Sequence, residues 1–109
     1  MQNTKNQEYY AYKEITENPI ILDFSNCKNL TDIHFVFKQK FGLPEYYGEN
    51  PDALWDLLDG LFIGLGEITA KIYGFNSLNP DLQKNCKVLF EVLDDVQSES
   101  ENFNYEIID

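Results

Sequence analysis

Asp52, Asp56 and Asp59 are the residues of this chain whose type and spacing best suit a binding site. A helix turns by about 100° per residue, so these carboxylates fall on one narrow stripe of a helix surface. Every polar position on that stripe is acidic, whereas an ordinary soluble helix mixes both signs and gains from oppositely charged residues four apart. The pattern therefore indicates a surface for a basic partner.

A solvated helix face is the alternative interpretation of the same acids. Carboxylates four residues apart repel each other, which costs helix stability and argues against an incidental arrangement. Aromatic residues also lie close by, with Tyr46 and Tyr47 in the preceding loop and Trp55 beside the acidic stripe. Tyrosine and tryptophan are enriched where protein interfaces concentrate their binding energy. We therefore expect the acids and the aromatic residues to form one protein-binding surface.

Catalytic motifs are absent from the sequence. There is no phosphate-binding glycine loop, nucleophile elbow or helical pair of zinc-binding histidines. The run Asp23-x-Ser25-x-Cys27 starts like a calcium loop but lacks the required glycine and glutamate. Asp52 and Asp56 share one convex helix and cannot face each other across a cleft, as glycosidase carboxylates do. We expect no enzymatic activity, no cofactor and no metal ion.

The helix that carries the acids has well-marked ends. Asn50 can cap the first free amides, Pro51 fits the first helical position, and Gly60 suits the left-handed residue after the last turn. A helix that begins at Pro51 gathers its aliphatic side chains opposite the aspartates; these are Leu54, Leu57, Leu58 and Leu61. We therefore expect this side to face the core.

Strands are predicted at the beginning, middle and end of the chain. Apolar runs and alternating patterns place them near residues 20–24, between Gly64 and Gly74, and near residues 103–107. The first run opens with three consecutive apolar residues, Ile20, Ile21 and Leu22, which predicts a strand covered on both faces. Strands separated by helices form a parallel sheet with right-handed connections. The fold class is thus α/β, a small three-stranded parallel sheet with crossover helices.

Two further helices are predicted between these strands. Thr31 is expected to cap a helix that ends at Phe41, with Gly42 as its stop. His34 falls inside this helix, and we expect a packing role for it because no cysteine or serine is arranged for it to activate. The longest helix is expected to begin at Asn79-Pro80-Asp81 and to be followed by an acidic turn at residues 98–102.

The strongly negative net charge indicates which kinds of partner the protein can bind. The chain has 19 acidic residues against 8 lysines and arginines, a formal net charge of −11. Such a charge repels nucleic acid and anionic membranes and attracts cationic proteins. No apolar run of about 18 residues and no secretion signal is present, so we expect a cytoplasmic protein. Cys27 and Cys86 lack metal-ligand spacing, and we interpret them as reduced, partly buried thiols.

The first eighteen residues differ from the rest of the chain. Residues 1–18 are mostly polar and show no sustained periodicity, so we expect a mobile tail ahead of a single domain at residues 19–109. The alternative is that Tyr9, Tyr10 and Tyr12 pack on the body or on a partner.

The string LPEYYGENPDALWDLLDG, at residues 43–60, closely resembles the corresponding segment of the barstar family of intracellular ribonuclease inhibitors. Weaker similarity extends over residues 19–109, with strands and helices in the family's order. The resemblance implies a barstar-like fold. It also implies an inhibitor that inserts this helix and its loop into the active site of a basic ribonuclease.

The same resemblance implies roles for individual residues. Asp56 matches the principal mimic of an RNA phosphate, with Asp52 and either Asp94 or Asp95 as secondary acids. Further contact positions are matched by Tyr46, Asn50 and Trp55. The chain departs from the family near the end of this helix, where Asp59 and Leu61 replace a threonine and a tryptophan. We therefore expect the edge of the interface, and the cognate enzyme, to differ.

Two other functions fit the same acidic surface. One is an immunity protein against an unrelated nuclease toxin, and the other is an acidic adaptor that binds a basic protein other than a nuclease. In each case the partner is a basic protein. We expect the chain to be a monomer that binds neither nucleic acid nor membrane.

Overall fold

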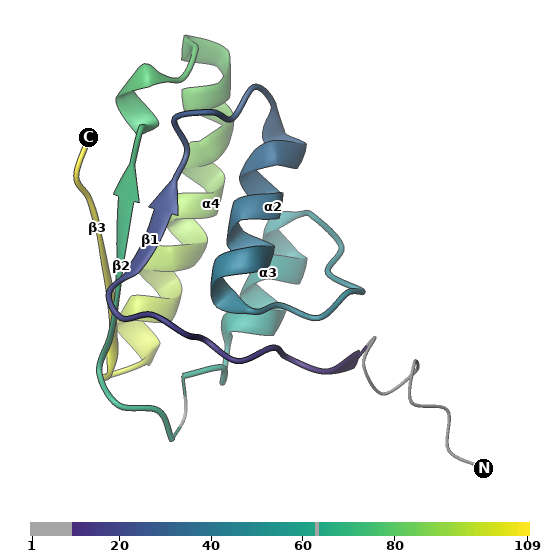
Figure 1. The fold of residues 1–109 in the computed structure, drawn as a ribbon, viewed down its shortest axis with the longest axis vertical. Helices are drawn as coiled ribbons and strands as arrows, with labels where there is room; N and C mark the ends of the chain where they lie inside the picture. Colours follow the sequence, from purple (N-terminus) through teal and green to yellow (C-terminus); the bar gives the residue numbers. More distant parts are fainter. Residues whose placement is uncertain (1–9, 63) are drawn as a thin grey trace.

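A parallel sheet with crossover helices forms the body of the protein, as a computed structural model of residues 10–62 and 64–109 shows (Figure 1). The sheet has three strands in the order β1-β2-β3. The strands are β1 (Ile20–Asp23), β2 (Ile68–Tyr73) and β3 (Phe103–Ile107), and the helices are α2 (Leu30–Phe41), α3 (Pro51–Leu58), α4 (Pro80–Glu99) and a short 3-10 helix, η1 (Phe75–Ser77). The predicted α/β fold class is confirmed.

Helices α2, α3 and α4 all lie on the same face of the sheet (Figure 1). Two right-handed connections that step in the same direction place their helices on one face. Buried and partly exposed residues therefore alternate along β2. The prediction that β1 is covered on both faces is wrong. Ile20 and Leu22 are buried under the helices, whereas Ile21 is half-buried and Asp23 is exposed, because α2, α3 and α4 all lie on the one face.

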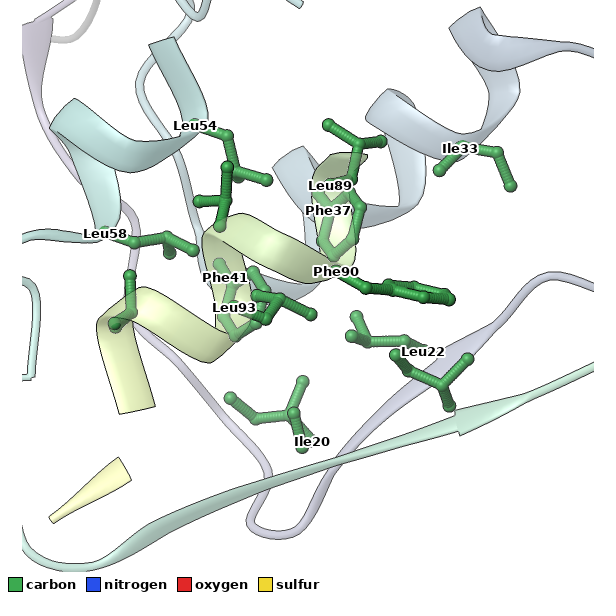
Figure 2. Close-up of a cluster of buried hydrophobic side chains, with 14 of the residues drawn as sticks. Ile20, Leu22, Ile33, Phe37, Phe41, Leu54, Leu58, Leu89, Phe90 and Leu93 are labelled. Atoms are coloured by element: carbon green, nitrogen blue, oxygen red, sulfur yellow. The ribbon is translucent and has the colours of Figure 1, made fainter. Parts of the chain in front are cut away.

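The core lies between the sheet and the helices, and it fixes the orientation of α3. Side chains from β1, α2, α3 and α4 meet there (Figure 2); they include Ile20, Leu22, Phe37, Phe41, Leu54, Leu58 and Leu93. Phe62, just beyond α3, stacks on Phe103 of β3 with ring centroids 4.4 Å apart. With Leu54 and Leu58 fully buried, the opposite side of α3 faces solvent.

Asparagine side chains cap the starts of α2, α3 and α4. Asn29, Asn50 and Asn79 each accept a hydrogen bond from the backbone N–H three residues further on. Capping by Asn50 and Asn79 confirms the predicted starts of α3 and α4. The predicted cap Thr31 is wrong because α2 already begins at Leu30, which leaves Asn29 in the capping position.

The ends of α2 and α4 show one confirmed and one corrected prediction. Helix α2 ends at Phe41, as predicted, and Gly42 caps it with a φ of 63°, the left-handed conformation expected there. Helix α4 continues to Glu99, so the predicted turn at residues 98–102 is reduced to residues 100–102. Gln97 ties the added turn to β3, because its side-chain oxygen accepts a 2.9 Å hydrogen bond from the backbone N–H of Tyr105.

The described part of the amino-terminal segment, residues 10–18, lies against the lower ends of α2 and α3 (Figure 1). The Tyr12 hydroxyl donates a 2.7 Å hydrogen bond to the carbonyl of Leu57, and the Lys13 N–H donates a 2.8 Å hydrogen bond to the carbonyl of Gly42. Tyr12 thus packs on the body, as the alternative to a mobile tail proposed. The boundary between residues 18 and 19 stays a prediction. Residues 1–9, which include Tyr9, lie outside the described residues.

Both cysteines are free thiols. Cys27 is half-buried and Cys86 is buried, and burial raises the pKa of each thiol to about 11. A thiol with such a pKa stays protonated and unreactive at neutral pH. These two residues therefore contribute packing rather than chemistry.

Candidate functional site

The solvent side of α3 carries the acids predicted from the sequence. Asp52, Asp56 and Asp59 are all exposed, whereas Leu54, Leu57 and Leu58 on the other side are buried. We call these three aspartates the acidic surface. The helix is rigidly placed because its leucine side belongs to the core, so the carboxylates project from a fixed support.

No positively charged side chain among residues 10–62 and 64–109 neutralises the acidic surface. Among the described residues, none of these carboxylates forms an ion pair, and α3 has no basic residue in its last turn. Asp56 and Asp59 lie at the carboxyl end of α3, where the helix dipole disfavours negative charge. Only Asp52, in the first turn, is favoured by that dipole. The arrangement therefore costs helix stability and leaves the acids available to an external cation.

The loop before α3 is shaped by Asn50. Its side-chain oxygen accepts a 2.8 Å hydrogen bond from the N–H of Ala53, and its side-chain nitrogen donates a 3.1 Å hydrogen bond to the carbonyl of Gly48. Glu49, just before it, has a φ of 52° in the left-handed region. The Asn50 side chain thus holds the loop and the helix start together, and its predicted contact with a partner stays a prediction.

The aromatic residues of this region take different positions. Tyr46 is 41% exposed, and Trp55 is half-buried with its ring packed against the edge of the core. Tyr47 is only 6% exposed and contacts His34, so the expectation that it borders the binding surface is wrong. Its hydroxyl lies 2.5 Å from Nδ1 of His34, which is itself buried. The structural role expected for His34 is confirmed.

The structure separates Asp94 from Asp95, which the sequence could not do. Both are exposed on α4, but Asp94 lies on the flank beside β3, where it accepts a 2.6 Å hydrogen bond from the Tyr105 hydroxyl. Burial and this hydrogen bond raise the pKa of Tyr105. One residue further on, Asp95 lies about 100° around the helix, beside the buried Val92 on the opposite flank. Helix α3 packs on α4, and which of the two acids contacts a partner stays a prediction.

Sequence reasoning gave packing of the amino-terminal tyrosines only as the alternative to a mobile tail, and it did not identify their contacts. The ring centroids of Tyr10 and Tyr46 are 5.5 Å apart. The phenol of Tyr46 also contributes to a raised pKa of Tyr12, after the larger effect of burial. These contacts join residues more than thirty positions apart, and no local periodicity reports such pairs. The only sequence clue was the repetition of tyrosine in a polar segment.

Two classes of site find no support in the described part of the chain. No group of three or more histidine, cysteine, aspartate or glutamate side chains is placed to hold a metal ion among these residues. None of the described helices combines the length and the apolar character needed to cross a bilayer. The acidic surface and its loop therefore remain the candidate site.

Comparison with known proteins agrees with this geometry. The family described as "Barstar (barnase inhibitor)" matches residues 18–108. A protein of Bacillus subtilis (strain 168) named "Putative ribonuclease inhibitor YrdF" is 35% identical over 80 residues, which cover 73% of this chain and 86% of that protein. The match spans both the sheet and the helices that position the acidic surface, and the chain belongs to the barstar family.

Proposed function

We propose that this protein inhibits a basic ribonuclease by placing α3 and the preceding loop in the active site of that enzyme. The observation that carries the proposal is the acidic surface itself, three exposed carboxylates on a rigid helix with no cationic partner among the described residues. Family membership and the name of the Bacillus relative support the same role.

The chemistry of a ribonuclease active site explains why such a surface binds it. The enzyme must hold RNA phosphates with arginine, lysine and histidine in a cleft that stays open to solvent. A carboxylate presented on a rigid helix accepts charge-assisted hydrogen bonds from the same side chains. The inhibitor therefore occupies the phosphate positions and excludes RNA.

Within this proposal the acids have graded roles. Asp56 lies between Asp52 and Asp59 along the exposed side of α3 and is the principal phosphate mimic. Asp52 is a secondary acid at the helix start, and Asp95 is a further one on α4. Asp59 supplies an additional charge at the end of the helix, which suits an enzyme with an extra cation at that edge of its cleft.

The aromatic residues and the loop complete the proposed interface. Tyr46 and Trp55 flank the acids and exclude water from the charged contacts, which strengthens them. Asn50 fixes the path of the loop through its two side-chain hydrogen bonds. A preordered loop loses little conformational entropy when the partner binds.

Titration of enzymes with the purified protein tests the proposal. RNA cleavage by barnase and by a panel of other basic microbial ribonucleases is followed as the protein is added. We expect one-to-one loss of activity for at least one enzyme, and competition with a phosphate-containing substrate analogue. Undiminished cleavage by every ribonuclease contradicts the proposal, and tight binding of a basic non-nuclease protein in that case favours an adaptor.

A further inference from the structure

Outside the matched family region, the amino-terminal segment contacts both elements of the candidate site. The family match begins at residue 18, whereas Tyr10, Tyr12 and Lys13 lie before it. Their contacts go to the loop that follows α2 and to the last turn of α3. These are the two ends of the segment that carries the proposed interface.

The backbone of this segment passes directly over Gly42. The Lys13 N–H donates a 2.8 Å hydrogen bond to the carbonyl of Gly42. A Cβ atom at position 42 would lie 2.3 Å from the Lys13 carbonyl oxygen, so only glycine leaves room for the crossing. The close approach fixes the height of the segment above the loop.

Tyr12 ties the segment to the end of α3. The last carbonyls of a helix lack partners within it, and the carbonyl of Leu57 is one of them. The Tyr12 hydroxyl donates a 2.7 Å hydrogen bond to this oxygen. The bond joins the amino-terminal segment to the element that carries the acidic surface, and it orients the Tyr12 ring.

An ion pair between Lys13 and Glu45 joins the segment to the loop that precedes α3. The ammonium group of Lys13 lies 2.9 Å from one oxygen of Glu45, and that of Lys38 lies 2.8 Å from the other. The two lysines together lower the pKa of Glu45 to about 2. Because Lys13 and Glu45 are exposed and Lys38 is only partly buried, the pairs orient the loop more than they stabilise the fold.

Three exposed tyrosines lie where the amino-terminal segment contacts the loop before α3. Tyr10, Tyr12 and Tyr46 are 64%, 43% and 41% exposed. The rings of Tyr10 and Tyr46 lie 5.5 Å apart with a 50° tilt. Exposed aromatic rings gathered beside an acidic surface are typical of interfaces, because each tyrosine offers a large contact area at a low cost in conformational entropy.

We propose that Tyr10, Tyr12 and Tyr46 form an aromatic extension of the partner-binding face, on which a lysine or arginine of the basic ribonuclease rests. The electron-rich faces of tyrosine rings attract cations, and the chain's net charge of −11 favours a cationic partner. The extension is continuous with the loop that bears Tyr46, so one enzyme can contact both. This inference rests on the proposed ribonuclease inhibition.

Binding kinetics of tyrosine variants test the extension. The probe is whichever panel ribonuclease, barnase included, the parent protein inhibits most tightly. Tyr10→Ala should raise the dissociation rate constant about two- to fivefold, the range of an exposed cation–π contact. Tyr10→Phe keeps the ring and should restore the parent rate. Tyr12→Phe removes the hydrogen bond to Leu57 and should also accelerate dissociation.

Two controls separate contact from structure. Ile107→Ala alters a side chain of comparable exposure on β3, across the molecule from the amino-terminal segment (Figure 1). This variant should leave the kinetics unchanged. The melting temperature of Tyr10→Ala should equal that of the parent, because a side chain that is 64% exposed contributes little to the fold.

Each other outcome overturns the inference. Unchanged dissociation of Tyr10→Ala and Tyr12→Phe shows that the tyrosines lie outside the interface. Tighter binding of Tyr10→Ala shows that the segment obstructs the site. If no ribonuclease binds the parent, the proposed function fails and the extension fails with it. If the parent binds and the variants match it, only the extension fails.

Discussion

The Tyr47 hydroxyl lies 2.5 Å from Nδ1 of His34, and this buried pair joins α2 to the loop that precedes α3. Burial lowers the pKa of His34 and raises that of Tyr47, so both side chains are neutral at pH 7. The two groups share one hydrogen bond, and the tautomer of the His34 ring decides which of them donates. The pair anchors the loop at Tyr47, directly after the exposed Tyr46.

Acidification should weaken the fold through His34. Its pKa is below the ordinary value of 6.5 in the folded protein, with burial as the larger effect and Glu49 opposing it. The unfolded chain therefore binds the proton first, and stability falls as pH drops through 6.5 towards the folded-state pKa. We expect the free energy of unfolding to fall less between pH 7.5 and 5.5 in His34→Gln than in the parent. Urea denaturation at the two pH values checks this, and equal pH dependence of parent and variant contradicts it.

Removing the hydroxyl of the same pair should destabilise the protein without changing the acidic surface. Tyr47→Phe keeps the ring in the core but leaves Nδ1 of His34 buried without its partner. The expected loss is about 1–3 kcal/mol of unfolding free energy. Chemical denaturation measures it. Tyr46→Phe is the matched control, since this tyrosine is 41% exposed and should change stability by less than about 0.5 kcal/mol.

Asp56→Ala should weaken inhibition more than any other single change of an acid, while the melting temperature stays at the parent value or rises. Truncation of a central interfacial charge costs about 2–5 kcal/mol of binding, because the cations of the enzyme are left unpaired. The fold is spared because Asp56 is exposed and makes no ion pair among the described residues. Inhibition constants for Asp56→Ala and for Glu106→Ala, an exposed acid on β3, make the comparison. Equal constants for the two variants would remove Asp56 from its assigned role.

Asp94 and Asp95 should respond differently to the same substitution. Asp95→Ala should weaken binding, whereas Asp94→Ala should leave binding unchanged, because Asp94 lies beside Tyr105 on the β3 flank of α4. Loss of Asp94 also removes the acceptor of the Tyr105 hydroxyl, so the effect of that variant should appear in the melting temperature. Binding and unfolding measurements on both variants decide the assignment, and a binding defect confined to Asp94→Ala reverses it.

The parts of this protein that sequence predicts well are those governed by local rules. Asn50 and Pro51 mark the start of α3 through capping and backbone geometry, and helical spacing places Asp56 on the exposed side. Long-range contacts escaped prediction for a physical reason. The burial of Tyr47 depends on a histidine thirteen positions away, and the role of Tyr12 depends on a carbonyl forty-five positions away.

The sequence also did not predict that the described helices lie on only one face of the sheet. The apolar run that includes Ile21 predicted burial on both faces, because central parallel strands are usually covered twice. Here β1 is an edge strand, and both connections place their helices on one face. Strand order is set by the packing of the whole chain, and the composition of one strand does not contain it.

Salt should slow association with the ribonuclease far more than it speeds dissociation. The net charge of −11 and the exposed carboxylates of α3 attract a cationic enzyme before contact. The screening length is about 10 Å at 0.1 M ionic strength and about 3 Å at 1 M, so this steering fades as salt is added. Carboxylates desolvated in the complex are screened less, so the dissociation rate changes little.

Stopped-flow measurements from about 0.05 to 0.5 M salt should show association slowing by about tenfold or more. Asp56→Asn, which keeps the shape and removes one charge, should reduce the slope of that dependence. Association that is independent of salt would show that the acidic surface acts only after contact, and the steering mechanism would have to be abandoned.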